Sequence, residues 1–166
     1  ALQDAQGRGT LLRVPLSIDA RPAAGLDLAA ARAVVRDEAL RTLRRIVRAG
    51  TASDEDRKHG AEAAARLAAL DAGDLEGRLA RAAFGFVTGE AAEAIEQEAG
   101  AIVDEGLKDA GNRRELLAGA YALRAELRRR AAKLAEAEQD LAEGRKHLGE
   151  SPWLDEVESR LRRAQG

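Results

Sequence analysis

The chain has 166 residues, which is enough for one domain with a hydrophobic core and too few for two domains of ordinary size. Its hydrophobic fraction of 45% and charged fraction of 34% are typical of folded globular proteins and exclude a disordered chain. The net charge of −2 gives no overall field that would attract nucleic acid or an anionic membrane, and the absence of cysteine excludes disulfide bonds and thiolate chemistry.

The first 26 residues differ from the rest of the chain. The segment 10–19, TLLRVPLSID, has the apolar and β-branched character of a short strand, but Pro15 removes a backbone donor that a central strand needs. Pro22 and Gly25 then indicate a loop. We therefore expect residues 1–26 to form an extended N-terminal arm, which lies against the helices or is partly disordered, or which pairs with the sheet of a partner. Residues 27–166 are expected to form a single all-helical domain.

The first two predicted helices have clear start and stop signals. In residues 27–50, apolar side chains recur every three or four positions between a capping residue, Asp27, and Gly50. The second helix begins after Ser53, which forms a capping box with Asp56, and it continues to the DAGD segment at 71–74. Aromatic residues make up only 2% of the chain, so small and aliphatic side chains must fill the core, which favours the packing of helix on helix.

Two further helices follow at residues 75–88 and 92–106. Asp74 caps the first of them and Gly89 ends it, while the second ends near Gly106. Residues 90–109 carry seven acidic side chains and one lysine, whereas residues 113–133 carry seven basic and two acidic ones. These charges either form two solvated helix faces or attract neighbouring antiparallel helices to each other, although each exposed pair contributes only about 0–1 kcal/mol.

Residues 113–149 permit two interpretations. Asn112 and Glu115 mark the start, no proline interrupts the region, and no glycine occurs between Ala120 and Gly144. One helix of about 30 residues is therefore possible. Such a helix would extend beyond a domain of this size, so we expect a break at 131–134 instead. Ser151 and Pro152 then open a last helix, where we predict a buried Trp153 that anchors it together with Val157 and Leu161.

The paired helices in residues 60–166 resemble the tetratricopeptide repeat (TPR) family. The segment 79–102, LARAAFGFVTGEAAEAIEQEAGAI, has small residues at the family's positions and a turn glycine, which are Ala82, Gly89, Ala94 and Ala101. The segment 120–152, AYALRAELRRRAAKLAEAEQDLAEGRKHLGESP, has Tyr121, Ala125, Ala137, Leu141, Gly144 and Pro152 at corresponding positions. The two segments depart from the family because they are offset by about 43 residues rather than 34, and because Ala132 replaces the second turn glycine.

The resemblance implies an all-α fold of antiparallel helix pairs in a right-handed array. It also implies a concave groove lined by the first helix of each unit, which binds a peptide or protein partner. By position, that groove would contain Leu79, Ala83, Phe86, Ala122, Glu126 and Arg129. The alternatives are an irregular helical bundle with one long helix and a coiled-coil hairpin, in which the long helix would mediate self-association into a homodimer.

The sequence contains no pattern that indicates an enzyme. His59 and His147 each follow a glutamate by four residues, a spacing that does not match the Glu-x-x-His pairs of metal-binding bundles. The serines and threonines lie in no nucleophile motif, and GFVTGE lacks the residues of a phosphate loop. We therefore predict no catalytic activity, no metal and no cofactor. A basic run that includes Arg124 and Arg128 lacks the stacking aromatics of a nucleic-acid site, so a nucleic-acid partner is not expected.

No apolar run is long enough to span a membrane. The chain begins with Ala1 and contains no methionine, and its small and polar first residues would suit a new N-terminus left by signal removal. This beginning favours an exported, periplasmic protein slightly over a cytoplasmic one.

Overall fold

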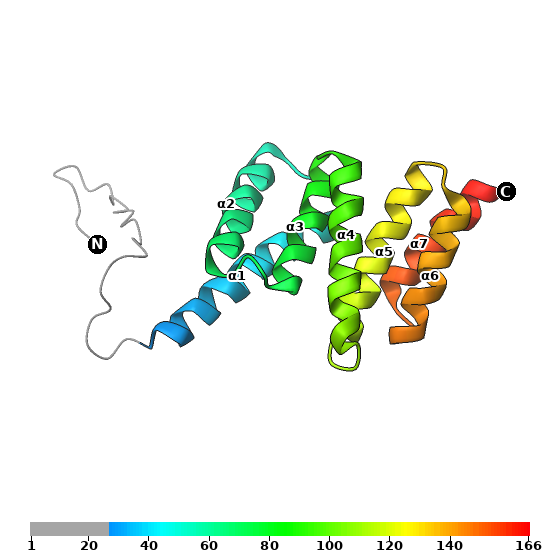
Figure 1. Cartoon of the computed structure of the whole chain (residues 1–166). Coiled ribbons are helices and arrows are strands. Elements are labelled where there is room, and N and C mark those ends of the chain that lie inside the picture. The colour runs from blue at the N-terminus through cyan, green and yellow to red at the C-terminus, as the bar shows by residue number, and fades with distance from the viewer. Residues whose placement is uncertain (1–26) are drawn as a thin grey trace. The chain divides into compact units, whose positions relative to one another are not determined.

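The computed structural model describes residues 27–166 (Figure 1), so the predicted arm at residues 1–26 lies outside the described residues. The described residues contain seven α-helices, one short 3₁₀ helix and no β-strand, which confirms the predicted all-α class. The helices are α1 (Leu28–Ala49), α2 (Asp54–Leu70), α3 (Leu75–Thr88), α4 (Ala92–Gly106), η1 (Leu107–Asp109), α5 (Arg114–Arg130), α6 (Leu134–Leu148) and α7 (Pro152–Gln165). Residues 32–166 form one compact unit, and the contacts between helices described below all lie within it.

Three of the predicted helix caps are present. The Asp27 carboxylate accepts bonds from the backbone N–H groups of Ala29 and Ala30 at the start of α1. Ser53 and Asp56 form the predicted capping box, and the Asp74 carboxylate accepts a bond from the Gly77 N–H at 3.3 Å. These side chains satisfy N–H groups that have no partner within their own helix.

The start of α5 was predicted wrongly. Arg113, not Asn112, is the N-cap residue, and it makes no side-chain capping bond. The Asn112 side chain instead donates to the carboxylate of Asp109 at 3.0 Å. Ser151 is the N-cap of α7, as predicted, but its hydroxyl makes no capping bond. Pro152 lies in the first turn of α7, where the missing N–H costs nothing.

Residues 113–149 form two helices. Helix α5 ends at Arg130 and α6 begins at Leu134, so the expected break is confirmed and the interpretation with one long helix is wrong. The two helices pack closely on each other. Burial of their facing surfaces outweighs the high helix propensity of the residues in the turn.

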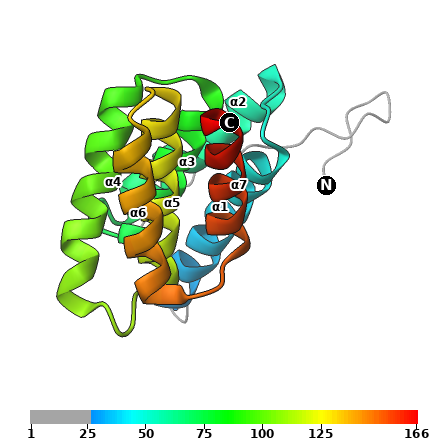
Figure 2. The same cartoon turned by 90° about the vertical axis from the view of Figure 1, so that its right-hand side faces the viewer.

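Each helix from α2 onward packs on the next one in the chain, and α5 also contacts α3 and α7. Figure 1 shows α5 between α4 and the pair formed by α6 and α7. In Figure 2, α4 and α6 lie on one side of α5 and α7 lies on its other side. Gly144 of α6 permits this close packing. A Cβ atom there would lie 3.0 Å from the Leu154 side chain of α7 and 3.1 Å from Tyr121 of α5.

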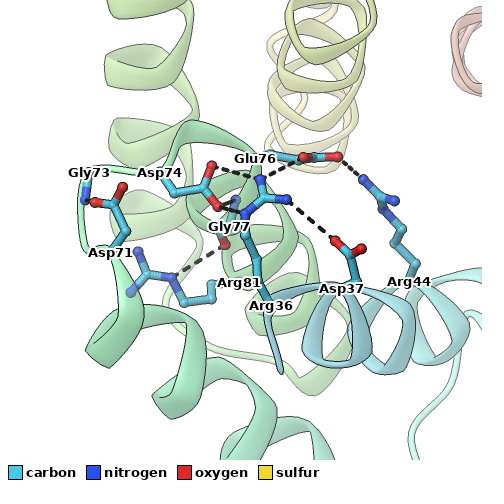
Figure 3. Close-up of polar contacts among 9 residues, drawn as sticks. All are labelled: Arg36, Asp37, Arg44, Asp71, Gly73, Asp74, Glu76, Gly77 and Arg81. Atoms are coloured by element: carbon cyan, nitrogen blue, oxygen red, sulfur yellow. Dashed lines mark hydrogen bonds and ion pairs between the residues drawn. The ribbon is translucent and has the colours of Figure 1, made fainter. Parts of the chain in front are cut away.

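An ionic network joins α1 to α3 (Figure 3). Arg36 donates to both carboxylate oxygens of Asp74, at 2.8 and 3.0 Å, and to Glu76 at 2.7 Å. Glu76 also accepts a bond from Arg44. Burial alone would raise the pKa of Asp74, but the bonds from Arg36 and from backbone N–H groups outweigh it and hold this pKa below the ordinary value. Together with a shared apolar cluster that includes Leu43 and Phe84, the network fixes α1 against α3.

A second network joins α5 to α6. The carboxylate of Asp140 is only 2% exposed and accepts bonds from Arg124, the shortest of 2.6 Å. Arg128 lies 3.0 Å from the same carboxylate and also donates to Glu96 of α4 at 2.9 Å. The basic residues predicted to attract α4 do so in this network, since Lys133 lies 3.4 Å from Glu96 as well. Every buried side-chain nitrogen and oxygen atom in the described part of the chain has a hydrogen-bond partner.

Candidate partner-binding site

The predicted groove residues of α3 lie at the junction with α5. Leu79 is half-buried and packs on a cluster from α4 and α5 that includes Ile102. Phe86 is also half-buried, and the guanidinium carbon of Arg130 lies 4.0 Å from the centre of its ring. Such a contact is a cation–π interaction. Ala83 is half-buried on the same helix. The side chains of Leu79 and Phe86 thus fill the contact between α3 and α5.

The predicted groove residues of α5 are more buried than expected. Ala122 is 2% exposed and belongs to an apolar cluster that Leu154 and other residues of α7 complete. Glu126 is 4% exposed, and its carboxylate lies 3.6 Å from Arg160 of α7. The resemblance to the TPR family predicted these residues from their positions in the repeat pattern. That pattern does not include the packing of α7 on α5, which buries them. Ala122 is therefore a core residue rather than a groove residue.

Glu126 organises the arginines around it. Arg129 donates to both of its carboxylate oxygens, at 2.8 and 2.9 Å, and Arg130 donates at 3.2 Å. Burial alone would raise the pKa of Glu126, but the bonds from Arg129 and Arg130 outweigh it and hold the pKa below the ordinary value of 4.5. The carboxylate is therefore ionised at neutral pH. It fixes the orientation of Arg129, the one predicted site residue that faces an open space.

This open space is a surface hollow of about 320 Å³ lined by Arg129, Arg160, Arg163 and Ala164, which we call the α5–α7 hollow. Arg160 also pairs with Glu156, at 2.7 Å. Arg163 donates to the Ser159 carbonyl at 3.3 Å and pairs with no carboxylate in the described residues. Arg130 and the three lining arginines thus surround only two carboxylates, Glu126 and Glu156, which pair with Arg129, Arg130 and Arg160. The positive charge exceeds the negative charge here, which favours an anionic ligand.

Trp153 was predicted to be buried, and this prediction is wrong. Its exposed fraction is 51%, while Leu154, Val157 and Leu161 form the buried face of α7. Successive residues of a helix point about 100° apart, so Trp153 lies at the edge of the buried face rather than at its centre. Because seven residues make almost two full turns, Trp153 lies on the same side of α7 as Arg160, which lines the α5–α7 hollow.

A second hollow, of about 290 Å³, is lined by four arginines of α1, namely Arg41, Arg44, Arg45 and Arg48. Two of them are paired with carboxylates of other helices, Arg44 with Glu76 and Arg45 with Asp56. All four belong to one helix, and all are exposed. The carboxylates that pair with them are partly exposed, whereas Glu126 is buried, so this α1 hollow is less preorganised than the α5–α7 hollow.

The two histidines do not form a metal site. His59 is exposed, and His147 is half-buried with its ring stacked on Tyr121 at a centroid distance of 5.9 Å. Within residues 27–166, no group of three or more histidine, aspartate and glutamate side chains could hold a metal ion. None of the helices described for this chain is long and apolar enough to cross a membrane.

Comparisons of the chain with protein-family models, with curated proteins and with solved structures found no match. The resemblance to the TPR family therefore stays a prediction. A function can be inferred only from the geometry and the charges described above.

Proposed function

We propose that this chain is a non-catalytic protein-interaction module, built as a TPR-like array of helix pairs, that binds a segment of a partner protein. The pairs would be α3 with α4 and α5 with α6, and α7 would cover the last pair. The contacts of α5 with both α3 and α7 support this arrangement, because the first helices of a repeat array pack on one another.

The α5–α7 hollow is the observation that carries the proposal. Its arginines come from two helices that are remote in the sequence, and the buried Glu126 holds Arg129 and Arg130 in fixed positions. Side chains that are ordered before binding lose less conformational entropy when a ligand binds. Arginine is also one of the residues most enriched at the energetic centres of protein interfaces.

The chemistry of the hollow supports a binding role rather than a catalytic one. Its lining offers guanidinium groups and one methyl group. Guanidinium groups stay protonated at any physiological pH, so they neither abstract protons nor attack electrophiles. A nucleophile paired with a general base, which most hydrolytic mechanisms need, is missing from this lining.

Site-specific photo-crosslinking tests the proposal. A photoreactive phenylalanine derivative replaces Ala164 in the hollow or, as the matched control, Ala101, an exposed alanine on α4. In extracts of the source cell we expect discrete crosslinked proteins from position 164 and none from position 101. Equal crosslinking at both positions, or none at 164, would contradict the proposal.

The alternative function is self-association into a homodimer. The long helix that was expected to mediate it is broken, so this alternative loses its structural basis. Light scattering separates the two functions. A monomer favours the interaction module, whereas a stable dimer that crosslinks to itself from position 164 would favour self-association.

A further inference from the structure

We propose that the α5–α7 hollow selects an acidic segment of the partner protein. In this arrangement, two carboxylates at alternate positions of an extended segment bind Arg160 and Arg163, and an apolar side chain farther along the segment packs on Trp153. This inference rests on the proposed interaction function and names the chemistry of the partner.

The charges of the hollow determine the first part of the ligand. Arg163 has no carboxylate partner in the described residues. Arg160 has two, but Glu126 also pairs with Arg129 and Arg130, and Glu156 is exposed to solvent. Guanidinium groups bind carboxylates through two parallel hydrogen bonds, which are stronger than bonds between neutral groups. The volume of about 320 Å³ lies at the lower end of the range for binding sites, about 300–1,000 Å³, and therefore suits a few side chains of a segment.

The position of Trp153 determines the second part. Trp153 and Arg160 are seven residues apart on one side of α7, which corresponds to about 10 Å along the helix at 1.5 Å per residue. An extended segment rises about 3.3 Å per residue and its side chains alternate between two sides, so the fourth residue, about 13 Å along, is the first that faces the same side and spans this distance. A half-exposed tryptophan beside charged groups is typical of an interface that buries an apolar side chain. The expected ligand has two acidic residues at alternate positions followed, four residues after the second, by an apolar residue.

The carboxylates around the hollow argue against a nucleic acid as the ligand. Glu126 and Glu156 lie among the arginines and would repel a continuous phosphate backbone. Sites for single strands also present several aromatic residues for base stacking, and Trp153 is the only tryptophan of the chain. A peptide with two carboxylates carries fewer negative charges past Glu126 and Glu156 than a continuous phosphate backbone does, so it meets less repulsion.

The single tryptophan provides the measurement. The probe is a capped synthetic peptide with two glutamates separated by one residue, then three spacer residues and a leucine. We expect a saturable blue shift of the Trp153 fluorescence as the leucine covers the ring. A peptide with glutamine in place of glutamate should bind about tenfold more weakly or worse. A peptide with glycine in place of leucine should bind more weakly and give no blue shift.

Two neighbouring arginines form a matched pair of variants. Arg163 lines the hollow, whereas Arg162 is exposed and pairs with Glu158 within α7. Both Arg163→Glu and Arg162→Glu change the net charge by the same amount. We expect Arg163→Glu to weaken peptide binding about tenfold or more and Arg162→Glu to change it less than about twofold. Circular dichroism verifies that both variants are folded.

Three results would overturn the inference. They are equal binding of the glutamate and glutamine peptides, equal losses in the two variants, and binding of a single-stranded oligonucleotide that depends on Arg163 while the peptides do not bind. If position 164 crosslinks a partner protein but the glutamate peptide does not bind, the acidic ligand is wrong and the interaction function stands. If position 164 crosslinks nothing, the interaction function itself fails.

Discussion

Gly89 after α3 and Ala132 after α5 have the same left-handed backbone, with φ angles of 84° and 59°. In each turn the next residue donates its N–H to a carbonyl five residues earlier, Glu90 to Gly85 and Lys133 to Arg128, both at 2.9 Å. Both helices thus end in the same closing motif. The left-handed conformation is free of cost for glycine but costs about 1–2 kcal/mol for alanine. Contacts elsewhere must therefore stabilise the α5–α6 turn.

These contacts are the ion pairs on either side of the turn. Asp140 of α6 binds Arg124 and Arg128 of α5, and Lys133 within the turn reaches Glu96 of α4. They hold α6 against α5 whether or not the turn residue is a glycine. The comparison shows that packing between helices can impose a turn that the local sequence does not favour.

The largest effect is expected when the network beside the alanine turn is removed. Asp140→Ala leaves Arg124 and Arg128 without their buried partner, so the free energy of unfolding should fall by about 3–5 kcal/mol. The control is Asp155→Ala, because Asp155 pairs with Arg145 at an exposed position and should contribute less than about 1 kcal/mol. Urea denaturation measures both variants. Similar losses in the two would show that burial of Asp140 does not matter.

The glycine turn provides the second test. Gly89→Ala should lower the free energy of unfolding by about 1–2 kcal/mol, because a Cβ atom meets no neighbour there and only the backbone conformation is unfavourable. Gly111 is an exposed glycine whose added Cβ would also meet nothing and whose φ is not left-handed. Gly111→Ala is therefore the control, and its stability should stay within about 0.5 kcal/mol of the original chain. Equal losses would show that the turn geometry is not the cause.

The reverse change at the alanine turn should stabilise the protein. Ala132→Gly removes the left-handed strain and increases the entropy of the unfolded chain, so the net gain should be about 0.5–1 kcal/mol. Ala131 precedes it with a φ of −82° and gains nothing from glycine. Ala131→Gly should therefore lose about 0.5–1 kcal/mol. A loss at position 132 as well would mean that Ala132 makes a stabilising contact that outweighs its strain.

The sequence predicts the helices well because their signals are local. Asp27, Ser53 and Asp74 are capping residues directly before an apolar period, and each one caps a helix in the structure. The break at 131–134 had no glycine or proline to mark it. It was expected only because one long helix would not fit a small domain, which is an argument about packing.

The candidate site was harder to predict because it joins remote segments. Arg129 and Arg160 meet only because α7 packs on α5, and the spacing of residues within either helix does not reveal this contact. For Trp153 a local signal was available. The apolar spacing of Leu154, Val157 and Leu161 defines a face on which the preceding residue lies at the edge rather than at the centre. The prediction of a buried Trp153 instead followed from the hydrophobic character of tryptophan.

The smallest expected effect is the pH dependence of the stability that Glu96 contributes beside the alanine turn. Hydrogen bonds from Arg128 and then from Lys133 hold the pKa of Glu96 below its ordinary value of 4.5. A carboxyl group whose pKa is lower in the folded state stabilises the fold fully above the ordinary value, and this contribution is lost as the pH falls through the lower pKa. Glu96 is partly exposed, so its share should be below about 1 kcal/mol.

The variant Glu96→Gln isolates this contribution. At neutral pH it should be less stable than the original chain, and the difference should shrink as the pH falls below 4.5, because protonated Glu96 has then lost the same charge. Glu38 is exposed in the middle of α1 and makes no ion pair in the described residues, so Glu38→Gln should follow the original chain at every pH. Urea denaturation over a series of pH values measures all three proteins. A difference between Glu96→Gln and the original chain that persists in acid would show that the shape of the side chain, rather than its charge, supports the turn at Ala132.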